Sequence, residues 1–252
     1  MNLSGVRLNI ISNLFTLNNN TMIFYLLFFY LLSESMATDS TNDAKSYDVS
    51  NKIICYYQGA MDLDGNYVLD PQNIPSECDA ILYVSLYINQ ESTIDIDEKL
   101  LKSVTDLKKP VIVAFERTER YSDWSAILGE EGNADETKML CDFAKKHKIQ
   151  GYDISYLAPD YNEGVDKNVA KNIIPYIKQL KELCPFLIIG VSISPVPETL
   201  NNKDVYNFEE LNKVLTYFDV DATKLNYCNP KLYNGLVPIT KSEPGDNYLY
   251  GL

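Results

Sequence analysis

The sequence alternates between short apolar runs and longer stretches with helical periodicity. The apolar runs are rich in β-branched and aromatic residues and are bounded by polar or turn residues, as is typical of strands. They cover residues 52–57, 80–88, 110–115, 149–156, 186–193 and, more weakly, 222–227. Most of them are apolar at consecutive positions, which indicates strands that are covered on both faces, as in a parallel sheet.

Amphipathic stretches fill the intervals between these runs. In each of them apolar residues recur every three or four positions, and Asp or Asn stands at the start. They cover residues 97–108, 135–148, 166–183 and 207–218, and Pro175 is expected to kink the third. Strands and helices that alternate at this spacing predict right-handed βαβ units, in either an open doubly wound sheet or a (β/α)8 barrel.

The barrel is favoured over the open sheet, because no glycine-rich phosphate-binding loop follows the first run. A complete barrel takes about 250 residues. Six predicted strands are used up by Tyr227, and the segment 236–239 supplies at most one more. We therefore expect an incomplete (β/α)8 barrel, of TIM-barrel type, with strands seven and eight largely missing. A truncated gene product or a partial gene model is the alternative explanation.

The N-terminal part of the chain has the features of a secretory leader. The apolar run 22–32 is too short to cross a membrane, which needs roughly 20 residues. The tripeptide Ser35-Met36-Ala37 then gives the small-x-small pattern that signal peptidase cleaves. The protein is therefore expected to be secreted and extracellular, with no membrane anchor.

These features divide the chain into three parts. We expect residues 1–37 to form the signal peptide or leader, residues 38–50 a short polar linker, and residues 51–252 one barrel domain. The start stays open between Met1 and Met22, because the first 21 residues carry only one positive charge.

Charge and residue counts exclude several classes of function. A net charge of −13 disfavours binding to nucleic acid, whose phosphates need positive partners. The single histidine, His147, rules out most Ser-His-Asp and metal sites, and neither a cofactor nor a metal is expected. At the lysine-rich end of a predicted helix, His147 is expected to be a surface cation.

The five cysteines all follow the leader, so disulfides are expected and one thiol remains over. Cys141 and Cys184 each lie on a predicted helix that precedes a strand. Neighbouring helices could join them in a disulfide, or both could simply be buried.

The segment 149–159 carries the most informative motif. Its residues Gly151, Asp153 and Pro159 resemble the fourth strand of the family 18 glycoside hydrolases, the chitinases and chitinase-like proteins. That strand reads Asp-Gly-x-Asp-x-Asp-x-Glu, and the period of two between its last three acidic residues directs them to one face. In the family the final Glu is the general acid, and the middle Asp residues help the substrate N-acetyl group to act as nucleophile.

The motif departs from the family pattern at its other positions. Gln150 stands in place of the first Asp, Ser155 in place of the last Asp, and Leu157 in place of the acid Glu. Leucine cannot donate a proton, and loss of a general acid commonly slows a reaction about 10²- to 10⁴-fold. The resemblance therefore implies an inactive relative, and no catalytic residue is assigned.

The resemblance extends over about residues 52–229. Cys55 and Cys78 match the pair that many animal chitinases join, which implies a disulfide between them. Where the family has Ser-x-Gly-Gly after its third strand, this chain has bulk and charge at residues 114–117. The segment 225–228 resembles the family's Met-x-Tyr-Asp, with Tyr227 kept and Cys228 in place of the Asp.

Candidate ligand-binding residues follow from this resemblance. Asp153 is expected either to contact a ligand or to be a buried residue bonded to nearby backbone. Aromatic rings could stack on sugars or simply pack in the core; the candidates are Tyr57, Tyr83, Tyr152 and Tyr227. A substitute acid pair of Glu116 and Asp153 is a further, weaker alternative.

Three functions remain open at this point. The resemblance favours a secreted, catalytically inactive chitinase-like protein that binds chitin, a related N-acetylglucosamine glycan, or a protein receptor. An active chitin-degrading enzyme is one alternative. A signalling or immune effector without a sugar site is the other.

Overall fold

The computed structural model describes residues 46–59, 69–129, 134–160 and 163–221, all of which belong to one compact unit, Lys45–Leu252. The leader 1–37, the strand predicted at 222–227, Tyr227, Cys228 and the segment 236–239 lie outside the described residues. Among the described residues, no helix is both long and apolar enough to span a membrane.

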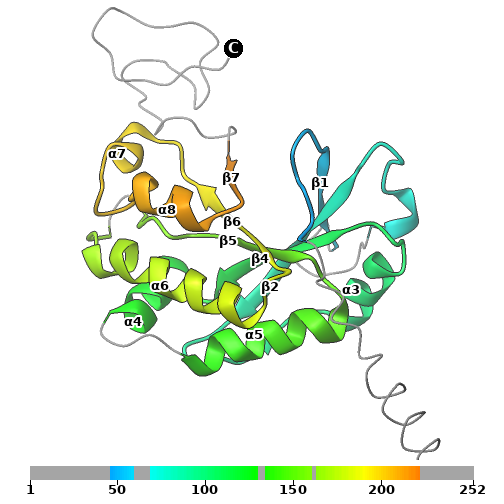
Figure 1. Ribbon diagram of the computed structural model, residues 1–252, viewed down its shortest axis with the longest axis horizontal. Coiled ribbons are helices and arrows are strands. Elements are labelled where there is room, and N and C mark those ends of the chain that lie inside the picture. Colours follow the sequence, from blue (N-terminus) through cyan, green and yellow to red (C-terminus); the bar gives the residue numbers. More distant parts are fainter. Residues whose placement is uncertain (1–45, 60–68, 130–133, 161–162, 222–252) are drawn as a thin grey trace, which may run out of the picture. The chain divides into compact units, whose positions relative to one another are not determined.

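Parallel strands form the centre of this unit (Figure 1), in the order β1-β2-β4-β5-β6-β7. The short β3 pairs with β2 in the antiparallel sense. The strands are β1 Ile54–Gln58, β2 Ala80–Ile88, β3 Ile94–Asp95, β4 Val111–Arg117, β5 Gly151–Ile154, β6 Ile188–Ile193 and β7 Tyr217–Val220. Five of the six predicted runs therefore form strands.

Helices connect the strands, as the alternation of patterns predicts. They are α3 Glu98–Thr105, α4 Arg120–Leu128, α5 Ala134–His147, α6 Lys167–Leu183, α7 Pro197–Leu200 and α8 Phe208–Val214, with a 3-10 turn, η1, at Pro71–Asn73. The side chains of Asp97, Asp166 and Asn207 cap α3, α6 and α8 by accepting hydrogen bonds from backbone N–H groups of the first turn. The polar residues at the start of the predicted helices thus define the observed N-termini.

One prediction about the last helix is wrong. The helix expected over residues 207–218 ends at Val214, because Leu215 adopts extended backbone. Tyr217–Val220 then forms β7 and pairs with β6. The apolar residues Leu215 and Phe218 fit the helical period, but pairing with the sheet edge outweighs that local pattern.

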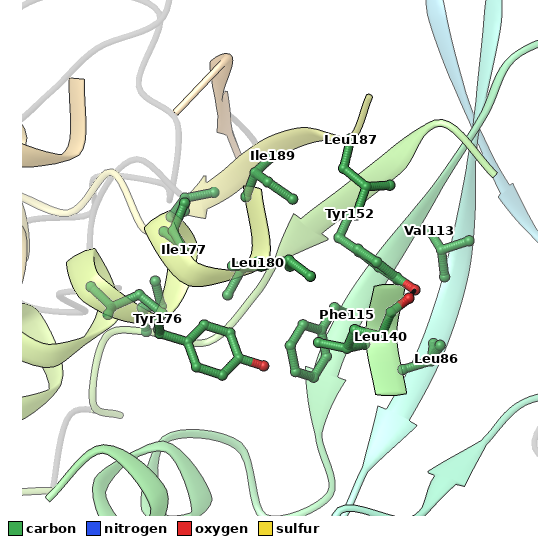
Figure 2. Packing of buried hydrophobic residues seen from close by; sticks show 14 of the residues in the cluster. Leu86, Val113, Phe115, Leu140, Tyr152, Tyr176, Ile177, Leu180, Leu187 and Ile189 are labelled. Atoms are coloured by element: carbon green, nitrogen blue, oxygen red, sulfur yellow. Dashed lines mark hydrogen bonds between the residues drawn. The ribbon is translucent and has the colours of Figure 1, made fainter. Parts of the chain in front are cut away.

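The sheet buries two unequal apolar clusters. The larger one lies between the sheet and the helices, where strand residues such as Phe115 and Ile189 pack beside Leu140 of α5 and Leu180 of α6 (Figure 2). The smaller one, on the opposite face, comprises Leu82, Ile112, Ala114 and Ile188. Tyr47 and Val49, at the end of the segment predicted as a linker, pack against the smaller cluster.

The sheet curls into a half-barrel. Tyr56 of β1 donates a hydrogen bond to Asp219 of β7, although these are the first and last strands in the sheet order. A flat sheet of this width could not bring them together, because neighbouring strands lie about 4.8 Å apart. The described residues thus match an incomplete (β/α)8 barrel, as predicted.

Two disulfides link these elements. Cys55 of β1 is bonded to Cys78 just before β2, as the family resemblance implies. Cys141 of α5 is bonded to Cys184, the residue that ends α6, so these two helices are neighbours.

Candidate functional site

We call the concave face of the half-barrel, which lies opposite the helices, the open face. Alternation along each strand decides which side chains reach it. Tyr57, Leu86, Ile88 and Phe115 belong to the helix-facing core, so the residues next to them in sequence point to the other side. The open face therefore presents Tyr56, Tyr87, Glu116, Asp153, Ser155, Tyr217 and Asp219.

Asp153 lies at the floor of the open face with only 1% of its surface exposed. Burial raises its pKa to about 7; the Tyr217 hydroxyl partly opposes this rise and the charge of Asp219 adds to it. Its neighbour across the ladder is Gly190, where a Cβ atom would lie 2.2 Å from the Tyr217 ring. Glycine at this position gives the ring of Tyr217 the space to lie beside Asp153.

Two tyrosines and a second carboxylate complete the floor. The Tyr56 hydroxyl donates to Asp219, while 62% of the Tyr56 side chain stays exposed. Burial and the bond to Asp219 raise the pKa of Tyr56, and burial and the Asp153 carboxyl raise that of Tyr217. Both hydroxyl groups therefore stay protonated at neutral pH, and that of Tyr56 donates its proton to the hydrogen bond with Asp219.

A second group of polar residues lies near the C-terminal ends of β2 and β4. Tyr87 and Glu116 are direct neighbours across the ladder, and Ser85 and Tyr87 form hydrogen bonds with the Glu116 carboxylate. Burial raises the pKa of Glu116, although these hydrogen bonds and Arg120 oppose the rise. The Arg120 guanidinium lies 4.9 Å from the centre of the Tyr156 ring.

The end of β5 differs from the expected alternation. The strand stops at Ile154, and Tyr156 has a left-handed backbone with φ of 59°. This turn leaves Tyr156 37% exposed beside Glu116 and directs Leu157, 2% exposed, into the helix-facing core. Leu157, which the family resemblance aligns with the acid, therefore does not face the open side of the sheet.

The other motif positions separate in space. Ser155 is partly buried, and its carbonyl oxygen accepts a hydrogen bond from Trp124 Nε1 at 2.9 Å. Gln150 precedes β5 at the opposite end of the strand, where its side-chain amide donates to the Lys148 carbonyl. Of the four degenerate positions, Asp153 and Ser155 therefore remain together on the open face.

Most of the predicted sugar-stacking tyrosines lie in the core. Tyr57 and Tyr83 are 1% and 3% exposed, and their ring centres lie 6.0 Å apart on the helix side of the sheet. Tyr152 is also buried there, with its hydroxyl donating to the Leu140 carbonyl. In this structure, core packing therefore accounts for these three rings, and Tyr227 lies outside the described residues.

Sequence reasoning missed the tyrosines that do reach the open face. Tyr56, Tyr87 and Tyr156 are among the exposed large apolar side chains. For Tyr56 and Tyr87 the alternation of the strands could have supplied the signal, since a buried Tyr57 or Leu86 directs its neighbour to the other face. For Tyr156 no such signal existed, because a left-handed residue interrupts the alternation.

His147 is not the surface cation that its position suggested. Its ring packs 4.3 Å from that of Phe143, and burial lowers its pKa. Within the described ranges, no group of three His, Cys, Asp or Glu side chains is placed to hold a metal ion.

Comparisons with known proteins bear on this geometry. No protein-family model and no curated protein matches the sequence. Solved structures match with high probability, among them the Group IV chitinase of Ostrinia furnacalis, with a TM-score of 0.60 and 19% identity over 78% of this chain and 57% of that one.

Two further chitinases match a similar share of this chain with the same TM-score. An immunomodulatory active chitinase from Trichuris suis matches with a TM-score of 0.60 and 16% identity, over 78% of this chain and 57% of that one. The chitinase domain of the spore coat protein CotE from Clostridium difficile matches with a TM-score of 0.60 and 14% identity, over 76% and 56%. This chain thus spans little more than half the length of the chains it matches, and over that span it has the fold of the family 18 chitinases.

Proposed function

We propose that this protein is a secreted chitinase-like protein that binds N-acetylglucosamine glycans on its open face and does not hydrolyse them. Ligands of (β/α)8 barrels bind at the C-terminal ends of the strands. Near these ends this chain presents the exposed rings of Tyr87 and Tyr156 beside Glu116, and on the same face the exposed ring of Tyr56 lies beside Asp219. Flat aromatic faces next to hydrogen-bonding groups suit sugar rings, which have an apolar face and a polar rim.

The C-terminal end of β5 gives the strongest support for an inactive protein. Ser155 and Tyr156 occupy it, and Leu157 is buried in the core. Burial raises the pKa of Tyr156 above its usual value near 10, so this hydroxyl is a poor proton donor at neutral pH. None of these three side chains can act as the general acid of the family mechanism.

Secretion is supported by the apolar leader and by the two disulfides. Disulfides persist in oxidising compartments and are rare in reducing ones. Mass spectrometry of the protein recovered from the medium of secreting cells tests this part, since we expect an N-terminus near residue 38. Retention of the protein inside the cells would contradict secretion.

Calorimetric titration with chito-oligosaccharides tests the binding function. We expect saturable binding and a loss of about tenfold in affinity for Tyr56→Ala, since aromatic contacts contribute about 1 kcal/mol or more. Val165→Ala is the control, because Val165 is also exposed but lies just before α6. Absence of binding at millimolar ligand would instead favour an effector that acts only through its surface.

An active enzyme is the second candidate, because two carboxyl groups on the open face hold protons unusually well. The pKa of Asp153 is about 7 and that of Glu116 is raised, so either could supply a proton near neutral pH. A fluorogenic chito-oligosaccharide assay decides between the candidates. We expect no turnover; turnover that Glu116→Gln or Asp153→Asn abolishes would establish the enzyme.

A further inference from the structure

Carboxyl groups from three separate strands lie on the open face. Glu116 lies on β4, Asp153 on β5 and Asp219 on β7, and all three point away from the helices. The charged group that acts on Asp153 is Asp219, which is itself acidic. Ionising these carboxyl groups close together without a cation is unfavourable, so their charged forms create a demand for a cation on this face.

Asp153 shows this demand most directly. It is 1% exposed, and among the described residues its Oδ2 atom has no hydrogen-bond partner of good geometry. The buried Tyr217 hydroxyl beside it also lacks such a partner. Leaving buried polar atoms unpaired costs on the order of 1–3 kcal/mol each, and a bound donor could recover that cost.

The cation at the rim of this face, Arg120, is already engaged. Its guanidinium stacks on the Tyr156 ring and lies 3.7 Å from the Asp160 carboxylate. It opposes the raised pKa of Glu116, whereas the charged group that acts on the pKa of Asp153 is Asp219. The floor formed by Asp153, Tyr217 and Asp219 therefore remains without compensation from the described basic residues.

Tyrosine rings lie next to these carboxylates. Tyr56 is hydrogen-bonded to Asp219, and Tyr87 is hydrogen-bonded to Glu116. An aromatic face beside a carboxylate is the combination that binds an ammonium group, through cation–π attraction and an ion pair. An uncharged acetamido group would satisfy neither interaction.

We propose that the open face prefers glycans with free primary amines, such as oligomers of glucosamine, over fully N-acetylated oligomers of the same length. This preference rests on the proposed function, because it assigns a class of glycan to the same face. Asp219 and Glu116 form the ion pairs with the amines, and the rings of Tyr56 and Tyr87 pack against the sugars that carry them.

Titration of the full chain with two matched hexasaccharides tests the preference, one fully deacetylated and one fully acetylated, at the same pH and ionic strength. We expect the deacetylated oligomer to bind about tenfold more tightly, which corresponds to about 1.4 kcal/mol. We expect Glu116→Gln and Asp219→Asn each to weaken binding of the deacetylated oligomer about tenfold and to weaken binding of the acetylated oligomer much less, so that most of the preference is lost.

Glu182→Gln on α6 is the matched control, because it removes the same charge from an exposed position in the helix layer. Equal or tighter binding of the acetylated oligomer would overturn the preference and leave the proposed function standing. Binding of neither oligomer would overturn both. A loss of preference in Glu182→Gln as large as in the other variants would overturn the site, since the net charge of the protein would then explain the attraction.

Discussion

Leu157 illustrates how a single backbone angle changes the meaning of a sequence motif. Aligned by its motif, Leu157 replaces an acid; in the structure its side chain packs in the helix-facing core. The left-handed backbone at Tyr156 causes this change of side. At this position the chain therefore offers the open face neither an acidic group nor an accessible side chain.

Leu157→Glu should consequently fail to restore an enzyme. The new carboxylate would replace a 2% exposed apolar side chain and would be buried without a described partner. We expect no turnover of a fluorogenic chito-oligosaccharide and a loss of several kcal/mol in the free energy of unfolding. Leu157→Met is the control, since it conserves volume and should cost less than about 1.5 kcal/mol. Hydrolysis by the Glu variant would contradict this view of β5.

Asp153 should make stability depend on pH in an unusual direction. Its pKa rises from 3.8 to about 7 on folding, so the folded state binds more protons than the unfolded state between these values. Its contribution to stability therefore falls as pH rises from about 4 to about 7, and it stays low above pH 7. Over this pH range the free energy of unfolding falls by about 4 kcal/mol, since each pKa unit corresponds to about 1.4 kcal/mol.

Asp153→Asn removes this titration. We expect its stability relative to the original protein to increase between pH 4 and pH 8, as measured by urea denaturation at each pH. Asp204→Asn, at an exposed position, is the control and should show no such trend. Parallel pH profiles for Asp153→Asn and the original protein would show that Asp153 does not titrate in this range.

Arg117 and Glu136 form an ion pair in the helix-facing core. Both side chains are fully buried, and the two guanidinium nitrogens lie 2.9 and 2.5 Å from the carboxylate oxygens. The Tyr176 hydroxyl donates to the same carboxylate, and the guanidinium lies 4.3 Å from the Trp124 ring centre. Because water is excluded from the buried pair, each charge is stabilised by the opposite charge of its partner.

Glu136→Ala should therefore be strongly destabilising. It leaves the Arg117 charge buried, and breaking such a pair typically costs about 3–5 kcal/mol. Urea denaturation measures the change. Asp142→Ala is the control, because the Lys138–Asp142 pair is exposed on α5 and should change stability much less. Equal losses of stability in the two variants would show that the buried pair is no more important for folding than the exposed pair.

At the scale of elements, the disulfide Cys141–Cys184 fixes the end of α6 against α5. It closes a loop with a sequence separation of 43 residues, which restricts the unfolded chain. Replacing both cysteines by Ala should lower the free energy of unfolding by about 2–4 kcal/mol. Reductant should affect this variant less than the original protein, and peptide mapping should find the bond in the latter. A free thiol at Cys141 in the secreted protein would contradict this bond.

Local patterns predicted most of these elements because helices and strands have different periods. The residues Asp97, Asp166 and Asn207 marked helix starts correctly, since capping depends on neighbouring backbone N–H groups alone. The predicted helix extended to residue 218, beyond the observed end of α8 and into β7, because Leu215 and Phe218 suit both a helix and a strand. The short helices α4 and α7 were missed, as neither forms a long amphipathic pattern.

At the scale of the whole molecule, the curl of the sheet creates the candidate site. It brings Tyr56 and Asp219, 163 residues apart, into contact and gathers carboxylates from three strands on one face. The match to chitinases with 10–19% identity shows that this architecture tolerates extensive change in sequence. Buried positions need only apolar volume, whereas the open face is free to acquire new chemistry.

The sequence by itself determined the order of strands and helices, the barrel class and the Cys55–Cys78 bond implied by the family resemblance. The order of elements follows from residue periods, whereas the bond and the choice of the barrel rest on the family resemblance. Only the tertiary structure decided that Tyr57 and Tyr83 face the helices while Tyr56 and Tyr87 face the open side. An alternating strand has two faces, and the packing of helices against one of them selects which side chains remain available to a ligand.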